Sequence, residues 1–172
     1  MNNKLKAFWF KYYGFVVLVI LAMIIAFSIL IMPIGNNPLA SYATFAGLAL
    51  TTIYFVQKQK LEEMKLFKDL FTEFNERYDC LNGKLSDIKS NKIGDPGKVN
   101  KILDDYFNLC SEEYLFYKEG RIHNEAWGSW CRGMKEHLSN DAINAYWEKA
   151  QKENSYYGLT TAVIAKGAKI KT

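Results

Sequence analysis

"VNKILDDYFNLCSEEYLFYKE", residues 99–119, is the stretch that decides the fold. Its apolar residues recur every three or four positions, which is the spacing of one face of an α-helix. They are Val99, Ile102, Leu103, Tyr106, Cys110, Tyr114 and Tyr117. Asp95 and Pro96 precede the stretch as a typical helix start, and Gly120 follows it as a typical helix end. The stretch therefore predicts a helix with one buried face.

Two further helices are expected after it. Asn124 is placed to cap a helix that carries Trp127 and Trp130 on one face. Ser139 or Asn140 is placed to cap another, with Trp147 inward. Because no strand pattern occurs, residues 98–157 are predicted to form a small all-α bundle. Residues 158–172 are expected to be a basic tail.

A stripe of mostly aromatic residues precedes the bundle, within a predicted helical stalk at residues 58–81. Its members, spaced by three and four, are Met64, Phe67, Phe71, Phe74 and Tyr78. This spacing is typical of a seam between helices. The stripe is expected to fold back onto the bundle as core, and a self-associating stalk remains open. Residues 82–97, rich in Gly, Ser, Asn and Lys, read as a linker.

The N-terminal third differs in charge. From Tyr12 to Gln57 the chain has no acidic or basic residue and no histidine. Residues 1–57 are therefore predicted to be a membrane anchor, a hairpin of two transmembrane helices at 12–32 and 39–56. A re-entrant hairpin is the alternative. Small residues at a spacing of four would let the two helices approach closely. They are Ala22, Ala26, Ala43, Gly47 and Thr51.

Basic residues predict the orientation of this hairpin. Lysines flank both ends of it, and the turn "PIGNNP" (residues 33–38) has none. Positive residues stay in the cytoplasm, so the expected location is an inner (plasma) membrane with both termini cytoplasmic and the lipid bilayer as a partner. The net charge of +4 comes mostly from the N-terminal lysines. The nearly neutral remainder does not favour nucleic-acid binding.

The sequence contains few residue patterns that are typical of a catalytic or metal-binding site. It has no glycine-rich phosphate loop, and its three cysteines and two histidines lack the spacing of a metal site. Neither a metal, a cofactor nor an enzymatic activity is therefore expected. One alternative is the pair Arg132 and His137, which resembles the RNase motif of the HEPN helical domains. That resemblance implies His137 as general base and Arg132 on the scissile phosphate. The other interpretation is an exposed arginine and a surface histidine.

The segment "YFNLCSEEYLFYKEGRIHNEAWGSWCRGM" (residues 106–134), followed by "INAYWEKAQ" (143–151), carries a second resemblance. It resembles a family of small bacterial proteins that have an N-terminal membrane anchor and a cytoplasmic helical domain of unknown function. The shared pattern is an acid near the middle of a helix, Glu113 here, then the turn "KEGRI" and tryptophans on the next helix. The resemblance covers residues 98–151 and implies a mobile-element or phage-defence context.

Together these features predict a membrane-anchored interaction or regulatory protein at the cytoplasmic face. Its protein partner is not named by the sequence, and a homo-oligomer is open. One alternative is an effector that oligomerises through the hairpin and perturbs the bilayer. The second is the RNase with Arg132 and His137. Glu113, beside the aromatic stripe, is the polar residue that we expect to matter most in the bundle.

Overall fold

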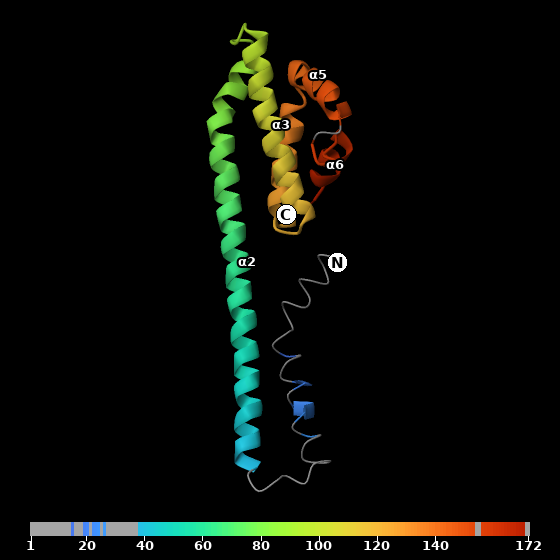
Figure 1. Ribbon diagram of the computed structural model, residues 1–172. Coiled ribbons are helices and arrows are strands. Elements are labelled where there is room, and N and C mark those ends of the chain that lie inside the picture. The colour runs from blue at the N-terminus through green and yellow to red at the C-terminus, as the bar shows by residue number, and fades with distance from the viewer. Residues whose placement is uncertain are drawn as a thin grey trace. The chain divides into compact units, whose positions relative to one another are not determined.

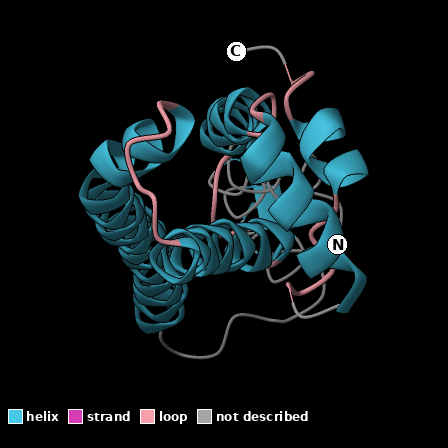
Figure 2. Cartoon of the chain, turned by 90° about the horizontal axis from the view of Figure 1, so that it is seen from above, coloured by secondary structure: helices cyan, strands magenta, loops and turns pink. Residues whose placement is uncertain are grey.

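The computed structural model describes residues 15, 19–20, 22–24, 26, 38–153 and 156–170, and every regular element that it bounds is a helix (Figure 1). The elements are α2 (Pro38–Lys89), α3 (Pro96–Lys118), α4 (Asn124–His137), α5 (Asp141–Ala150), the 3₁₀ helix η1 (Gln151–Glu153) and α6 (Thr161–Gly167). Figure 2 shows the described chain as helices joined by loops, without a strand. The predictions of an all-α fold and of a helical bundle are confirmed. The chain divides into two compact units, Met1–Lys65 and Leu66–Thr172.

The first unit corrects the prediction of a transmembrane hairpin. Among the residues that the structure describes, no helix combines the length and the hydropathy needed to cross a membrane. The second predicted span, 39–56, is part of α2, where serine, threonine and tyrosine residues dilute its apolar character. Most of the first span, 12–32, and the turn at 33–37 lie outside the described residues. The hairpin prediction is therefore wrong, and the location at a bacterial membrane stays a prediction.

The small residues assigned to hairpin packing are exposed. Ala22 and Ala26 are helical and exposed, as are the three positions on α2. Those three are Ala43, Gly47 and Thr51. The Thr51 hydroxyl donates a hydrogen bond to the carbonyl of Gly47, 2.8 Å away, in its own helix. A Cβ built on Gly47 would lie in open space.

Local capping chemistry sets where the helices of the second unit begin. The Asp95 carboxylate accepts a hydrogen bond from the N–H of Gly97 at 2.9 Å and so caps α3. Asn140 caps α5 in the same way. The prediction for α4 is shifted by one residue. His123 is its N-cap, without a side-chain hydrogen bond, and Asn124 is already helical. Two of the three predicted helix starts are thus set by a side chain at the cap position.

Aromatic side chains from α3, α4 and α5 form the core of the second unit. Phe107 and Trp147 are fully buried and stack with ring centroids 4.5 Å apart. Trp127 is 1% exposed and stacks on Tyr117 at 4.9 Å. Large rings bury much apolar area, and well-placed pairs add about 0.5–1.5 kcal/mol each. These helices are therefore held together mainly by ring packing.

The aromatic stripe of α2 belongs mostly to this core. Phe74 is 2% exposed, and Phe67 and Tyr78 pack against the core with partial burial. Phe71 is 40% exposed and stacks on Trp130 with centroids 5.8 Å apart. Met64 lies in the first unit and is exposed. The C-terminal part of the stripe is thus covered by the second unit's own helices.

The predicted linker at 82–97 is shorter in the structure. Helix α2 continues to Lys89 because Leu81, Leu85 and Ile88 extend its buried face. In Figure 1 this part of α2 runs beside α3, and Arg77 joins the two helices by an ion pair to Glu112. The composition of the segment indicated a loop, and tertiary packing overrode that local preference.

The predicted tail at 158–172 contains a helix. The Thr160 hydroxyl accepts a hydrogen bond from the N–H of Val163 and caps α6, where Ile164 is 1% exposed. Gly167 brings α6 against α4. A Cβ at Gly167 would overlap the Cys131 sulfur, so only glycine fits without rearrangement. Seven residues are too few for a helical period to be visible in the sequence.

Candidate functional site

A cavity of about 210 Å³ lies between α2, α3 and α4, within the second unit. It is lined by Asn75 and Tyr78 from α2, by Tyr106 and Glu113 from α3, and by Ser129, Trp130, Gly133 and Met134 from α4. Each helix contributes residues three, four or seven positions apart, which share a face. A Cβ built on Gly133 would meet no atom within 4 Å, so its missing side chain helps to keep the space open.

Glu113 is the buried carboxyl group of this cavity, with 5% of its surface exposed. Burial raises the pKa of Glu113 to about 8, with Arg77 opposing and Glu112 adding to the rise. Arg77 does not neutralise it, because its guanidinium donates to the two oxygens of Glu112 at 2.6 and 3.1 Å. The described residues give the Glu113 carboxyl no hydrogen bond. At pH 7 Glu113 is therefore mostly a neutral acid that lines a cavity without a protein partner.

His137 lies next to this cavity rather than in it. Its Nε2 is 3.0 Å from the hydroxyl of Tyr78, and its Nδ1 is buried without a hydrogen bond in the described part of the chain. Burial, with a smaller effect from Lys89, lowers the pKa of His137 to about 4. The imidazole is therefore neutral at pH 7. It holds the phenol of Tyr78, which is a cavity wall.

The phenol and thiol groups near Glu113 are also neutral. Burial raises the pKa of Tyr106 and of Cys110 well above their usual values. It raises the pKa of Cys131 to about 12. A thiol that stays protonated is a poor nucleophile. Within the described residues no group of three or more His, Cys, Asp or Glu side chains is placed to hold a metal ion. The site favours binding over covalent chemistry.

The structure separates the two residues of the RNase alternative. Arg132 is exposed, and its Nη1 donates a hydrogen bond to the carbonyl of Ile170 at 3.1 Å. His137 is 5% exposed and faces Tyr78. Five helical steps place the two side chains about 140° apart around α4. The interpretation of His137 as a surface residue is wrong, because α2 covers it.

Four residues that the sequence singled out meet in the cavity, namely Tyr78, Tyr106, Glu113 and Trp130. Trp127 and Trp147 do not line it and belong to the core. Sequence reasoning missed Asn75, Ser129, Gly133 and Met134 as lining residues. One signal was available, since small residues four positions apart on α4 leave space opposite large aromatic ones.

Comparison of the chain with known protein families, with curated proteins and with solved structures finds no match. The resemblance to small bacterial proteins of a phage-defence context stays a prediction.

Proposed function

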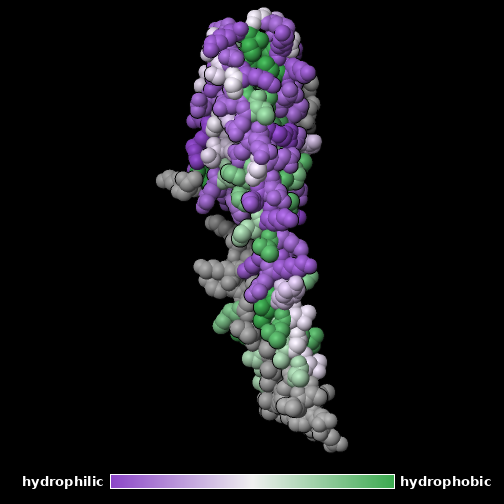
Figure 3. Space-filling model, turned by 90° about the vertical axis from the view of Figure 1, so that its left-hand side faces the viewer, coloured by the Kyte–Doolittle hydropathy of each residue, from purple (hydrophilic) through white to green (hydrophobic). Residues whose placement is uncertain are grey.

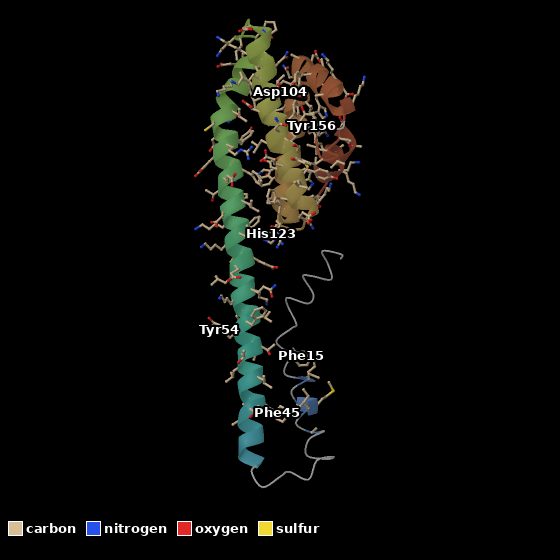
Figure 4. The ribbon with its side chains drawn as sticks, viewed as in Figure 1. Phe15, Phe45, Tyr54, Asp104, His123 and Tyr156 are labelled. Atoms are coloured by element: carbon tan, nitrogen blue, oxygen red, sulfur yellow. The ribbon has the colours of Figure 1, made fainter. Side chains whose placement is uncertain are left out.

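We propose that this protein is a helical interaction protein that binds a partner helix through the first unit's part of α2. One observation carries the proposal. Leu50, Tyr54, Leu61 and Met64 are 67–68% exposed, and together they form the partner seam. Figure 3 shows apolar side chains gathered over this part of α2, and Figure 4 labels Tyr54 on it. Exposed apolar side chains that share a face are typical of a contact surface.

The geometry of the partner seam favours a helix as its occupant. At about 100° per residue, the four side chains fall within about 80° of one another around α2. With Gln57 they follow steps of four, three, four and three, which is the a/d pattern of paired helices. Leu48 and Phe55 are also exposed but lie on the opposite side of the helix. Burial of each seam side chain would contribute about 1.5–3 kcal/mol before the losses of association.

The lysines beside the partner seam indicate which kind of helix can bind there. In this register Lys58, Lys60 and Lys65 occupy the positions that flank the seam. Flanking charges set partner choice in paired helices. A second copy of the chain would place lysine against lysine in either orientation. A helix with apolar seam residues and acidic flanks would instead pair its carboxylates with these lysines, each exposed pair adding about 0.2–1 kcal/mol.

A binding role is also favoured over catalysis. The RNase alternative needs Arg132 and His137 on one phosphate, but they face different elements. The effector alternative needs a transmembrane hairpin, and the described residues contain no helix that is long and apolar enough to span a membrane. The resemblance to proteins of a phage-defence context gives no residue of this chain a role.

The test uses two designed helical peptides with leucine at the seam positions and either glutamate or lysine at the flanking positions. Fluorescence anisotropy measures their binding to the full chain. We expect the acidic peptide to bind at least tenfold more tightly, with an affinity that falls as salt rises. Equal binding of both peptides, or a dimer of the chain by light scattering, would contradict the proposal.

A matched pair of variants locates the surface. Leu61→Asp is expected to remove binding of the acidic peptide, because it places a charge in the seam. Phe55→Asp changes a residue of similar exposure, 63%, on the opposite side of α2 and should leave binding unchanged. Loss of binding in both variants would show that the register is wrong.

A further inference from the structure

The residues that line the cavity of the second unit include one carboxyl group and no cationic side chain. Glu113 lines it, is 5% exposed and has no hydrogen-bond partner in the part of the chain that the structure describes. Arg77, whose charge acts on Glu113, is held by both oxygens of Glu112. A buried carboxylate is stable only with a counter-charge or hydrogen bonds. The cavity therefore lacks the group that would let Glu113 ionise.

The walls of the cavity suit a cation. Tyr78, Tyr106 and Trp130 line it on three different helices. Aromatic faces attract ammonium groups within about 6 Å, and the attraction grows when water is excluded. Asn75 and Ser129 add polar atoms for a hydroxyl or an N–H of a ligand. This combination of one carboxyl and several rings is the chemistry that recognises organic ammonium ions.

Other ligand classes fit less well. A metal ion needs several oxygen or nitrogen ligands, and Glu113 is the one carboxyl among the lining residues. An anion would meet that carboxyl. A neutral apolar molecule would leave it without a partner. The volume of about 210 Å³ equals about seven water molecules at their liquid volume, so the cavity suits a small ligand.

We propose that this cavity binds a small organic cation, an amine or quaternary ammonium compound of fewer than about ten non-hydrogen atoms. Glu113 is its counter-ion, and Tyr78, Tyr106 and Trp130 are its aromatic walls. The proposal concerns the second unit alone. It does not depend on the partner seam, and either can fail without the other.

Affinity should depend on pH through Glu113. The titratable groups that act on it or feel its charge are Arg77 and Tyr78 from α2, Tyr106, Cys110 and Glu112 from α3, and Cys131 from α4. The pKa values of the tyrosines and thiols are raised, so these groups stay neutral between pH 6 and 8. The Glu113 pKa of about 8 means that the cation must displace a proton. At pH 7 binding should release about 0.9 proton.

The experiment is isothermal titration calorimetry on the full chain with two cations and their neutral counterparts. Choline is paired with 3,3-dimethylbutan-1-ol, and n-butylamine with butan-1-ol. We expect at least one cation to bind at least tenfold more tightly than its counterpart at pH 8. Its affinity should fall about 50-fold at pH 6, as the ionised fraction of Glu113 falls.

Two variants decide whether Glu113 is responsible. Glu113→Gln keeps the shape and removes the charge, so it should abolish the preference for the cation while thermal melting shows a folded chain. Glu125→Gln alters an exposed acid outside the cavity and should bind as the wild type does. The proposal is overturned if neither cation binds below about 10 mM at pH 8. It is equally overturned if the neutral counterpart binds as well, or if Glu113→Gln keeps the preference.

Discussion

Two buried groups of the second unit should give its stability an unusual pH profile. Burial raises the pKa of Glu113 from 4.5 to about 8, so between these values the folded state holds a proton that the unfolded state has lost. Stability therefore falls as pH rises across this window, by about 1.4 kcal/mol per pH unit. Below pH 4.5 Glu113 is protonated in both the folded and the unfolded state, so its burial no longer lowers the stability.

His137 acts in the opposite direction. Burial lowers its pKa from 6.5 to about 4, so between these values the unfolded state holds the extra proton. The contribution of His137 to stability therefore rises with pH up to 6.5, and it is lost as pH falls through 4. The two effects oppose each other between pH 4.5 and 6.5, where the profile should be nearly flat. From pH 6.5 to 8 the effect of Glu113 exceeds the remaining effect of His137, and the free energy of unfolding should fall by about 1.3 kcal/mol.

The assay is urea unfolding of the full chain at pH 5, 6.5 and 8, followed by tryptophan fluorescence. Glu113→Gln should remove the fall above pH 6.5 and expose the His137 effect, a rise of about 1.6 kcal/mol between pH 5 and 6.5. Glu125→Gln should keep the wild-type profile. If the wild type were equally stable at pH 6.5 and 8, Glu113 would already be ionised in the fold, and the reasoning from burial would be refuted.

Three further predictions concern packing. Gly133→Ala should stabilise the chain by about 0.4–1 kcal/mol, because its Cβ enters open space, whereas Gly167→Ala should lower the melting temperature through overlap with α4. Phe74→Ala should cost about 3–5 kcal/mol in urea unfolding and Phe71→Ala clearly less, since the first is 2% and the second 40% exposed; equal losses would contradict the assigned core. Ellman's reagent should titrate one thiol, the exposed Cys80, in the native chain and all three in urea.

The parts of the fold that the sequence predicted are those with strong local signals. Asp95 and Asn140 cap helices where the sequence placed them, because capping needs only one side chain and the next turn. The aromatic stripe that contains Phe74 repeats every three or four residues, and this helical period can be seen in the sequence alone. The end of α2 at Lys89 and the docking of α6 depend on contacts with other helices. No local pattern in the sequence contains those contacts.

The prediction of a transmembrane hairpin gave the absence of charge more weight than the polar residues of the second segment. An uncharged stretch shows what is missing from a helix, but the hydropathy of a span depends on what is present. In 39–56 the polar residues are Ser41, Tyr42, Thr44, Thr51, Thr52 and Tyr54. Thr51 and Thr52 satisfy their hydroxyls by bonding carbonyls of their own helix at 2.8 Å. Such residues carry no charge, yet they lower the mean hydropathy of the segment.

The cavity raises a question that packing alone does not answer. A purely structural residue at position 113 would be better as glutamine or methionine, because the buried acid costs about 3 kcal/mol of stability at pH 7 relative to a neutral group. Arg77 could have offset that cost, but it is bound to Glu112 instead. The loss is recovered only when a cation enters and Glu113 ionises against it. A residue that is unfavourable in the empty fold and favourable in the occupied one is typical of a binding site, so Glu113→Gln should stabilise the empty protein and remove the ligand's effect on its melting temperature.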